Sequence, residues 1–153
     1  MAETKCGFND SENVSGAALL TRYGPTLFVN IGFDETFKGD AIPATIPIAG
    51  IKDVQALVDT GASVSCIDAL LATELGLPIV DRVPIGGVGG RHMVNMYLAQ
   101  IHVPSLNFTI YGSFAGVNLV EGGQVHKALI GRTFLENFTM TYEGKTGTVT
   151  ITS

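Results

Sequence analysis

Residues 56–63 constrain this chain more than any other stretch, because an apolar run there delivers a polar triplet and then a turn. Ala56-Leu57-Val58 is typical of the end of a buried strand, and Asp59-Thr60-Gly61 follows at once. A carboxylate at such a strand end is costly to bury unless it is hydrogen-bonded or paired. Gly61 lets another backbone, such as a bound peptide, approach closely. The triplet therefore indicates either a polar site or an ordinary turn, since turns also favour Asp and Gly.

Composition points to one globular domain rich in β structure. The chain has 153 residues, of which 46% are hydrophobic and 15% are charged, so it can bury a core and is not typical of a disordered protein. Its 19 glycines and repeated short apolar runs favour strands joined by tight turns. The polar, small residues at the start predict a loosely ordered N-terminal leader over residues 1–20 and a folded domain over 21–153.

Charge and patterning argue against several classes of partner. The net charge of −5 and the lack of a Lys/Arg run argue against nucleic acid. No apolar stretch has the length of a membrane span, and the start of the chain carries no signal-peptide core, which favours a cytoplasmic location. Cys6 and Cys66 do not make a disulfide framework. Because His92, His102 and His126 lack metal-ligand spacing, we expect no metal and no cofactor.

Strand patterns recur along the whole chain. Alternating or short apolar runs predict strands over 25–33, 42–51, 54–59, 82–85, 91–99, 106–111, 140–142 and 146–152. Lys52-Asp53 is expected to turn the chain between the second and third of these strands. Residues 113–124 are glycine-rich and favour no particular element.

One segment predicts a helix clearly. Residues 68–78 begin with Asp68, a good N-cap, and place Leu70, Leu71 and Leu75 on one face. Gly76 can then cap the C-terminus and Pro78 ends the helix. We expect this short helix to pack against the strand that carries Asp59.

A glycine-rich tip joins two of the predicted strands. Residues 86–90 read Gly-Gly-Val-Gly-Gly, which is more glycine than a tight turn requires. The sequence indicates either a mobile hairpin whose backbone amides reach a ligand or a merely flexible turn. It does not match a phosphate-binding loop, because no Lys-Ser/Thr and no helix start follow.

The second half of the chain repeats the pattern of residues 56–61 weakly. Ala128-Leu129-Ile130 is again an apolar, β-branched run, and Gly131 stands at its bend. Residues 132–138 can form a short helix after it. The sequence thus contains two strand-then-turn units, of which only the first ends in a carboxylate.

These marks together resemble the retropepsin-like aspartic proteases, the family of the retroviral proteases and their cellular relatives. The marks are residues 56–62 around Asp-Thr-Gly, the glycine tip 85–90, and Ala-Leu-Ile-Gly-Arg over 128–132. They stand in the family's order and span about half of the chain. The resemblance implies an all-β, closed barrel-like fold with one short helix, a flap hairpin at the glycine tip, and an active site shared by a homodimer.

The resemblance also implies roles for individual residues. Asp59 would be the catalytic aspartate, Thr60 would hydrogen-bond across the dimer, and Gly61 would offer its carbonyl to the substrate backbone. Arg132 matches an arginine that supports the active-site loop through an acid, but Ser63 stands in that acid's place. Arg132 would then hold a backbone carbonyl or another acid. Substrate contacts are implied at Leu57, Gly61, Ala62, Ile85, Gly86, Gly87, Val88 and Leu129.

The implied reaction is hydrolysis of a polypeptide substrate by an aspartic endopeptidase. Two carboxylates that share one proton supply both the base that activates water and the acid that protonates the carbonyl oxygen. This chain carries one Asp-Thr-Gly, so an identical subunit must bring the second. The alternative is a catalytically inactive peptide-binding or dimerisation module of the same fold. A cysteine hydrolase is disfavoured because Cys66 has no local His partner.

Overall fold

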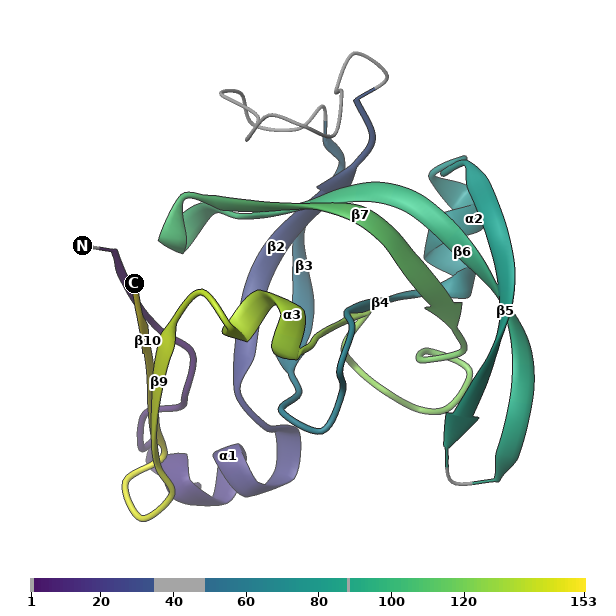
Figure 1. Cartoon of the computed structure of the whole chain (residues 1–153). Helices are drawn as coiled ribbons and strands as arrows, with labels where there is room; N and C mark the ends of the chain where they lie inside the picture. Colours follow the sequence, from purple (N-terminus) through teal and green to yellow (C-terminus); the bar gives the residue numbers. More distant parts are fainter. Residues whose placement is uncertain (1, 35–48, 88) are drawn as a thin grey trace.

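The computed structural model describes residues 2–34, 49–87 and 89–153 and consists mainly of strands (Figure 1). The helical segments are α1 (Gly16–Tyr23), α2 (Ala69–Glu74), α3 (Arg132–Leu135) and the 3-10 turn η1 (Pro104–Leu106). The strands are β1 (Glu3–Lys5), β2 (Thr26–Gly32), β3 (Ala49–Val58), β4 (Cys66–Asp68), β5 (Ile79–Gly87), β6 (Gly90–Val103), β7 (Phe108–Val117), β8 (Ala128–Ile130), β9 (Thr139–Glu143) and β10 (Thr148–Thr152). No helix among these described residues has the length and hydrophobicity to span a membrane.

The main sheet closes on itself. Its strand order is β2-β3-β8-β4-β7-β6-β5, and an additional β2–β6 pairing joins the first strand to the sixth. Among the described strands, β5 pairs with β6 alone and extends beyond the ring, as Figure 1 shows on the right. A separate sheet of order β1-β10-β9 stands beside the barrel. The predicted all-β, closed barrel-like class is thus confirmed.

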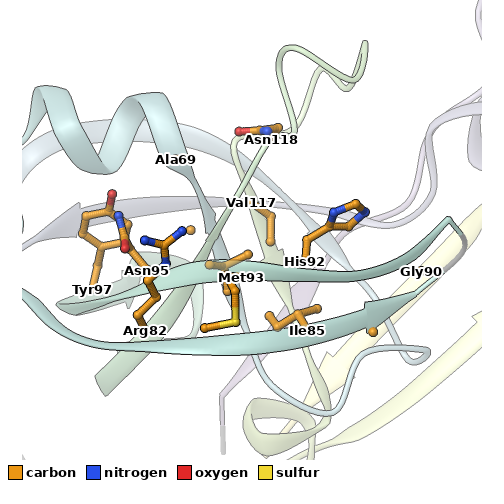
Figure 2. Close-up of a pocket in the computed structure, with 13 residues that line it drawn as sticks. Ala69, Arg82, Ile85, Gly90, His92, Met93, Asn95, Tyr97, Val117 and Asn118 are labelled. Carbon is orange, nitrogen blue, oxygen red and sulfur yellow. The ribbon is translucent and has the colours of Figure 1, made fainter.

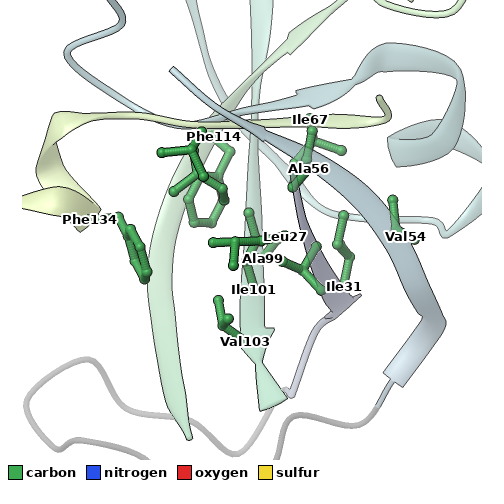
Figure 3. Packing of buried hydrophobic residues seen from close by; sticks show 14 of the residues in the cluster. Leu27, Ile31, Val54, Ala56, Ile67, Ala99, Ile101, Val103, Phe114 and Phe134 are labelled. Carbon is green, nitrogen blue, oxygen red and sulfur yellow. The ribbon is translucent and has the colours of Figure 1, made fainter. Parts of the chain in front are cut away.

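Alternation along the strands fills the barrel. In β3, Val54, Ala56 and Val58 are buried while Gln55 is exposed, which is the period of two expected when one strand face turns inward. Figure 3 shows Leu27 and Ile31 of β2 packed in the same cluster as Ala99 and Ile101 of β6. Each fully buried aliphatic side chain of this kind stabilises the fold by about 1.5–3 kcal/mol.

The prediction of a loosely ordered leader over residues 1–20 is wrong for this structure. Strand β1 pairs with β10, and Cys6 and Leu20 belong to the hydrophobic core with exposed fractions of 2% and 1%. The polar residues that suggested looseness satisfy the backbone instead. Ser15 caps α1 by accepting from the N–H of Ala18, and Asp10 accepts from the N–H of Gly16.

The predicted helix, the predicted turn at Lys52-Asp53 and the predicted strand over 42–51 have different outcomes in the structure. The helix over 68–78 is confirmed as α2, and α3 lies in the range 132–138 where a short helix was expected. Helix α1 was not expected, so the one short helix of the implied fold is too few. The predicted turn at Lys52-Asp53 is wrong, because β3 continues through it. Asp53 instead has a φ of +55° at a register irregularity opposite β2, and its N–H donates to Asn30. The first part of the predicted strand 42–51, residues 42–48, lies outside the described residues.

Candidate active site

The two similar sequences, residues 56–58 and 128–130, pair with each other in the sheet. Strands β3 and β8 run parallel, with Ala56 opposite Ala128, Leu57 opposite Leu129 and Val58 opposite Ile130. The two similar sequences therefore lie side by side in register. Parallel strands carry their ends to the same edge, so the turn that begins at Asp59 and the turn that begins at Gly131 adjoin each other.

The Asp59 side chain stands in the first of these turns, one residue beyond β3. The backbone N–H of Asp59 donates to the Ile130 carbonyl at 2.8 Å, which anchors the start of the turn to β8. The side-chain Oδ1 of Asp59 accepts from the N–H of Gly61 at 2.9 Å. The backbone carbonyl of Asp59 accepts from the N–H of Ala62 at 3.2 Å. Asp59 is half-buried, whereas Thr60 and Gly61 are exposed. The carboxylate is thus oriented by its own turn while the triplet faces outward.

The turn that begins at Gly131 is hydrogen-bonded to the loop that follows Asp59. The N–H of Arg132 donates to Ala62 and the N–H of Thr133 donates to Ser63, at 2.9 and 3.0 Å. Gly131 donates to Ser65 Oγ at 3.0 Å. These bonds fix the loop after Asp59 against the start of α3.

Arg132 has a defined partner although Ser63 replaces the expected acid. Its Nη1 donates to the backbone carbonyl of Thr60 at 2.8 Å. Of the two alternatives that the sequence leaves open, the structure therefore selects the backbone carbonyl. A charged donor makes this bond stronger than a neutral one.

Leu57 and Leu129 face away from the barrel core. Both are half-buried, whereas their neighbours Ala56, Val58 and Ile130 are buried. Leu57 lines a cavity of 620 Å³, which we call the helix-side cavity. Its other lining residues come from the end of α1 and from the loop before β8, and they are Arg22, Tyr23, Gly24, Gly122, Gly123, Gln124, Val125 and His126.

The glycine-rich tip is a hairpin, as predicted. Strands β5 and β6 pair from Ile79↔Tyr97 to Gly87↔Gly90, and Gly89 and Gly90 both have a φ of +102°, which favours glycine. Of the residues expected to contact substrate here, Gly87 ends β5 and Val88 lies outside the described residues.

The hairpin covers a second cavity of 620 Å³, which we call the flap cavity (Figure 2). Ile85 and Gly86 line it from β5, His92 and Met93 line it from β6, and Val117 lines it from the end of β7. Figure 2 shows the Val117 and Asn118 segment running across the hairpin. Asp59 itself lines neither of the two cavities.

Two groups of cavity-lining residues were missed from the sequence. Residues 117–126 line parts of both cavities, and residues 22–24 line the helix-side cavity. The only signal in the first group was its glycine content, which predicts a loop but not what the loop faces. The second group lay at the edge of the supposed leader.

Cys66 is not a competing nucleophile. Burial, followed by the charge of Asp59, raises the pKa of its thiol to about 11. The thiol therefore stays protonated near neutral pH, and the thiolate is the form that attacks a carbonyl. The carboxylate of Asp59, oriented by the N–H of Gly61, is the other group at this turn that can exchange a proton.

A known protein family matches more than half of this sequence. The sequence pattern of the family described as gag-polyprotein putative aspartyl protease matches residues 44–137, which is more than half of the chain. Among solved structures, the chain is similar to one titled EIAV protease complexed with the inhibitor HBY-793. The similarity has 19% identity and a TM-score of 0.48, and it covers 74% of this chain and 86% of that one. No curated protein matches the chain. On the family match, this chain belongs to the gag-polyprotein aspartyl protease family.

Proposed function

We propose that this protein is an aspartic endopeptidase that hydrolyses peptide bonds with a pair of Asp59 carboxylates, one from each of two identical subunits. Asp59, Thr60 and Gly61 form the catalytic triplet. The observation that carries the proposal is the half-buried Asp59 carboxylate, held at one oxygen by the N–H of Gly61. The other carboxylate oxygen has no hydrogen-bond donor among the described residues.

The chemistry requires a second carboxylate. One carboxylate takes a proton from water as the water attacks the peptide carbonyl, and a protonated partner donates to the carbonyl oxygen. Two carboxyl groups that share one proton perform both tasks, since like charges held so close do not both ionise. A single Asp59 supplies one half of this device.

The chain offers no place for that second group at its own repeat. The residue that follows Ile130, in register with Asp59, is Gly131, and a Cβ there would lie 2.6 Å from the Val64 carbonyl oxygen. A side chain does not fit at this position without a shift of the neighbouring backbone, which supports a second carboxylate that comes from another subunit. A second copy related by a two-fold axis meets the need.

The remaining residues then take supporting roles. Thr60 hydrogen-bonds between the two subunits and Gly61 presents its carbonyl to the substrate backbone. The β5–β6 hairpin closes over the peptide, with Ile85 and Gly86 at its wall. Arg132 keeps the Thr60 carbonyl in place.

Mixed dimers test the proposal most directly. Wild-type protein is mixed with increasing amounts of Asp59→Asn protein under conditions of subunit exchange, and cleavage of a mixed peptide library is measured. Because heterodimers hold one Asp and one Asn at the shared site, activity should follow the square of the wild-type fraction. Wild-type protein diluted with a matched amount of inert protein is the control.

A linear fall of activity would show that each chain works alone and would overturn the shared site. Wild-type protein that binds library peptides without cleaving them would instead favour the non-catalytic module. A statine-type inhibitor should abolish the wild-type cleavage, because it mimics the tetrahedral intermediate of this reaction class.

A further inference from the structure

One segment contributes to the lining of both the flap cavity and the helix-side cavity. We call residues 117–126 the bridging segment. Its first residues, Val117 and Asn118, line the flap cavity, and its last five, 122–126, line the helix-side cavity. The middle of the segment, at Leu119 and Val120, therefore sets the position of both cavity walls at once.

A buried carboxylate holds that middle. Asp68 has an exposed fraction of 3%, and its Oδ1 accepts from the N–H groups of Leu119 and Val120, each at 3.1 Å. Its Oδ2 accepts from the N–H of Leu71 at 3.2 Å, which caps α2. Each oxygen thus has a separate task, one toward the bridging segment and one toward the helix.

The double task explains why this position carries an acid. A serine hydroxyl would suffice to cap a helix, and it would avoid the cost of burying a carboxylate. A serine has no counterpart of the carboxylate Oδ1, which is the oxygen that reaches Leu119 and Val120 while Oδ2 caps the helix. Hydrogen bonds from N–H groups to an ionised acceptor are also roughly twice as strong as neutral ones.

The bridging segment is held at its ends, where Val117 pairs with β4 and His126 is buried, and at Leu119, whereas the residues between Leu119 and His126 have few restraints of their own. It contains Gly122 and Gly123, the latter with a φ of +90°, and Val120 and Val125 are exposed rather than packed in the core. Three backbone bonds within the segment, from Leu119 to Val117, from Gly123 to Val120 and from Gln124 to Leu119, shape its turn. Its end is held to the barrel by the contact of His126 with Thr26.

We infer that Asp68 is a positioning residue for substrate. By fixing Leu119 and Val120 it holds the walls of both cavities, so that a bound peptide can fill the two cavities together. The inference rests on the proposed endopeptidase function and concerns how that site grips long substrates. Asp68 acts through the bridging segment and does not touch the reacting atoms.

The test replaces Asp68 with serine, which keeps a capping oxygen for Leu71 but cannot reach the bridging segment. The measurements are kcat and KM for the best substrate of the mixed peptide library and for versions shortened at either end. For the long peptide we expect KM to rise about tenfold and kcat to stay within about twofold, whereas the shortest peptide should lose little. Ser15→Ala, which removes the cap of α1, is the control for a general loss of helix capping.

Loss of activity toward long and short peptides by the same factor would overturn the inference, because it would reduce Asp68 to a stabilising cap. Unchanged kinetics would overturn it as well. If Asp68→Ser fails to fold, hydrogen exchange of wild-type protein decides: the amides of Leu119 and Val120 should be protected, and rapid exchange there would contradict the anchor.

Failure of the proposed function gives a different result. Wild-type protein would then cleave no peptide, and the same long and short peptides would be compared by Kd. A weaker Kd for long peptides alone in Asp68→Ser would support the positioning role in a non-catalytic module. Equal losses for long and short peptides would overturn that role there too.

Discussion

The loop after β3 and the loop after β8 are built alike but carry different chemistry. Both follow an Ala-Leu-β-branched strand end, and the two strands pair in register. The first loop presents the half-buried carboxylate of Asp59 beside exposed Thr60 and Gly61. The second presents Gly131, buried against the carbonyls of Val64 and Ala62.

The difference shows which feature serves the scaffold and which serves the site. The second strand-then-turn unit has no acid at the position that matches Asp59, whereas in the first unit the Asp59 carboxylate accepts a hydrogen bond from the N–H of Gly61. Gly131 is needed for packing, because it lets the second loop close onto the first. The first loop carries the proposed catalytic carboxylate, and the second loop is hydrogen-bonded to the first.

The largest effect is expected from Asp59→Asn. The amide keeps the shape and still accepts from the N–H of Gly61, but it cannot act as acid and base. Turnover should fall by at least about 10²–10⁴-fold, while the midpoint of urea unfolding stays near the wild-type value. Residual activity within tenfold of wild type would remove Asp59 from the mechanism.

The reverse pattern is expected at Gly131. In Gly131→Ala the added Cβ would lie 2.6 Å from the Val64 carbonyl oxygen, so the free energy of unfolding should fall by about 1–3 kcal/mol. Urea unfolding measures this loss. Gly112→Ala, at a strand glycine with no heavy atom within 4 Å of the added Cβ, is the matched control and should be nearly neutral. Equal stabilities of the two variants would contradict the proposed packing role.

A smaller effect on both properties is expected from Arg132→Gln. The variant loses the charged donor to the Thr60 carbonyl, and this contact is exposed, so stability should fall by about 1 kcal/mol or less. Because the Thr60 carbonyl belongs to the proposed catalytic triplet, kcat should fall about tenfold. Lys127→Gln removes a like charge from an exposed position on the same segment and should change neither quantity. A kcat for Arg132→Gln that equals the Lys127→Gln value would show that the contact is dispensable.

The smallest effect concerns His126, which precedes β8 and meets Thr26 and Gln124 at 2.9 and 3.2 Å. Burial lowers the pKa of His126 from its ordinary value, so the unfolded chain binds a proton more readily than the folded one. The free energy of unfolding should therefore be highest above about pH 6.5, and it should fall modestly as the pH drops below that value.

His126→Gln should flatten this fall, measured by urea unfolding at several pH values. Some dependence should remain, because burial also lowers the pKa of His102. A pH dependence identical to that of wild type would show that His126 does not contribute.

Much of the fold was predictable because it rests on local patterns. The alternation in 25–33 and 91–99, the Asp68 cap and the glycine tip each specify an element through neighbouring residues alone. The leader was mispredicted because its polar residues find partners far along the chain: β1 pairs with β10, and the N–H of Phe8 donates to the carbonyl of Gly147. No local pattern reports such pairings.

The sequence by itself determined the strand-rich class, the acid at the end of a buried strand, and the lack of a second acid at the repeat. These follow from residue types and their order. Only the tertiary structure decided that the two repeats lie side by side, that Arg132 holds the Thr60 carbonyl, and that Asp68 reaches Leu119 and Val120. Those contacts depend on strand pairing between distant segments, and the direction in which a side chain finds its partner is fixed only once the barrel has closed.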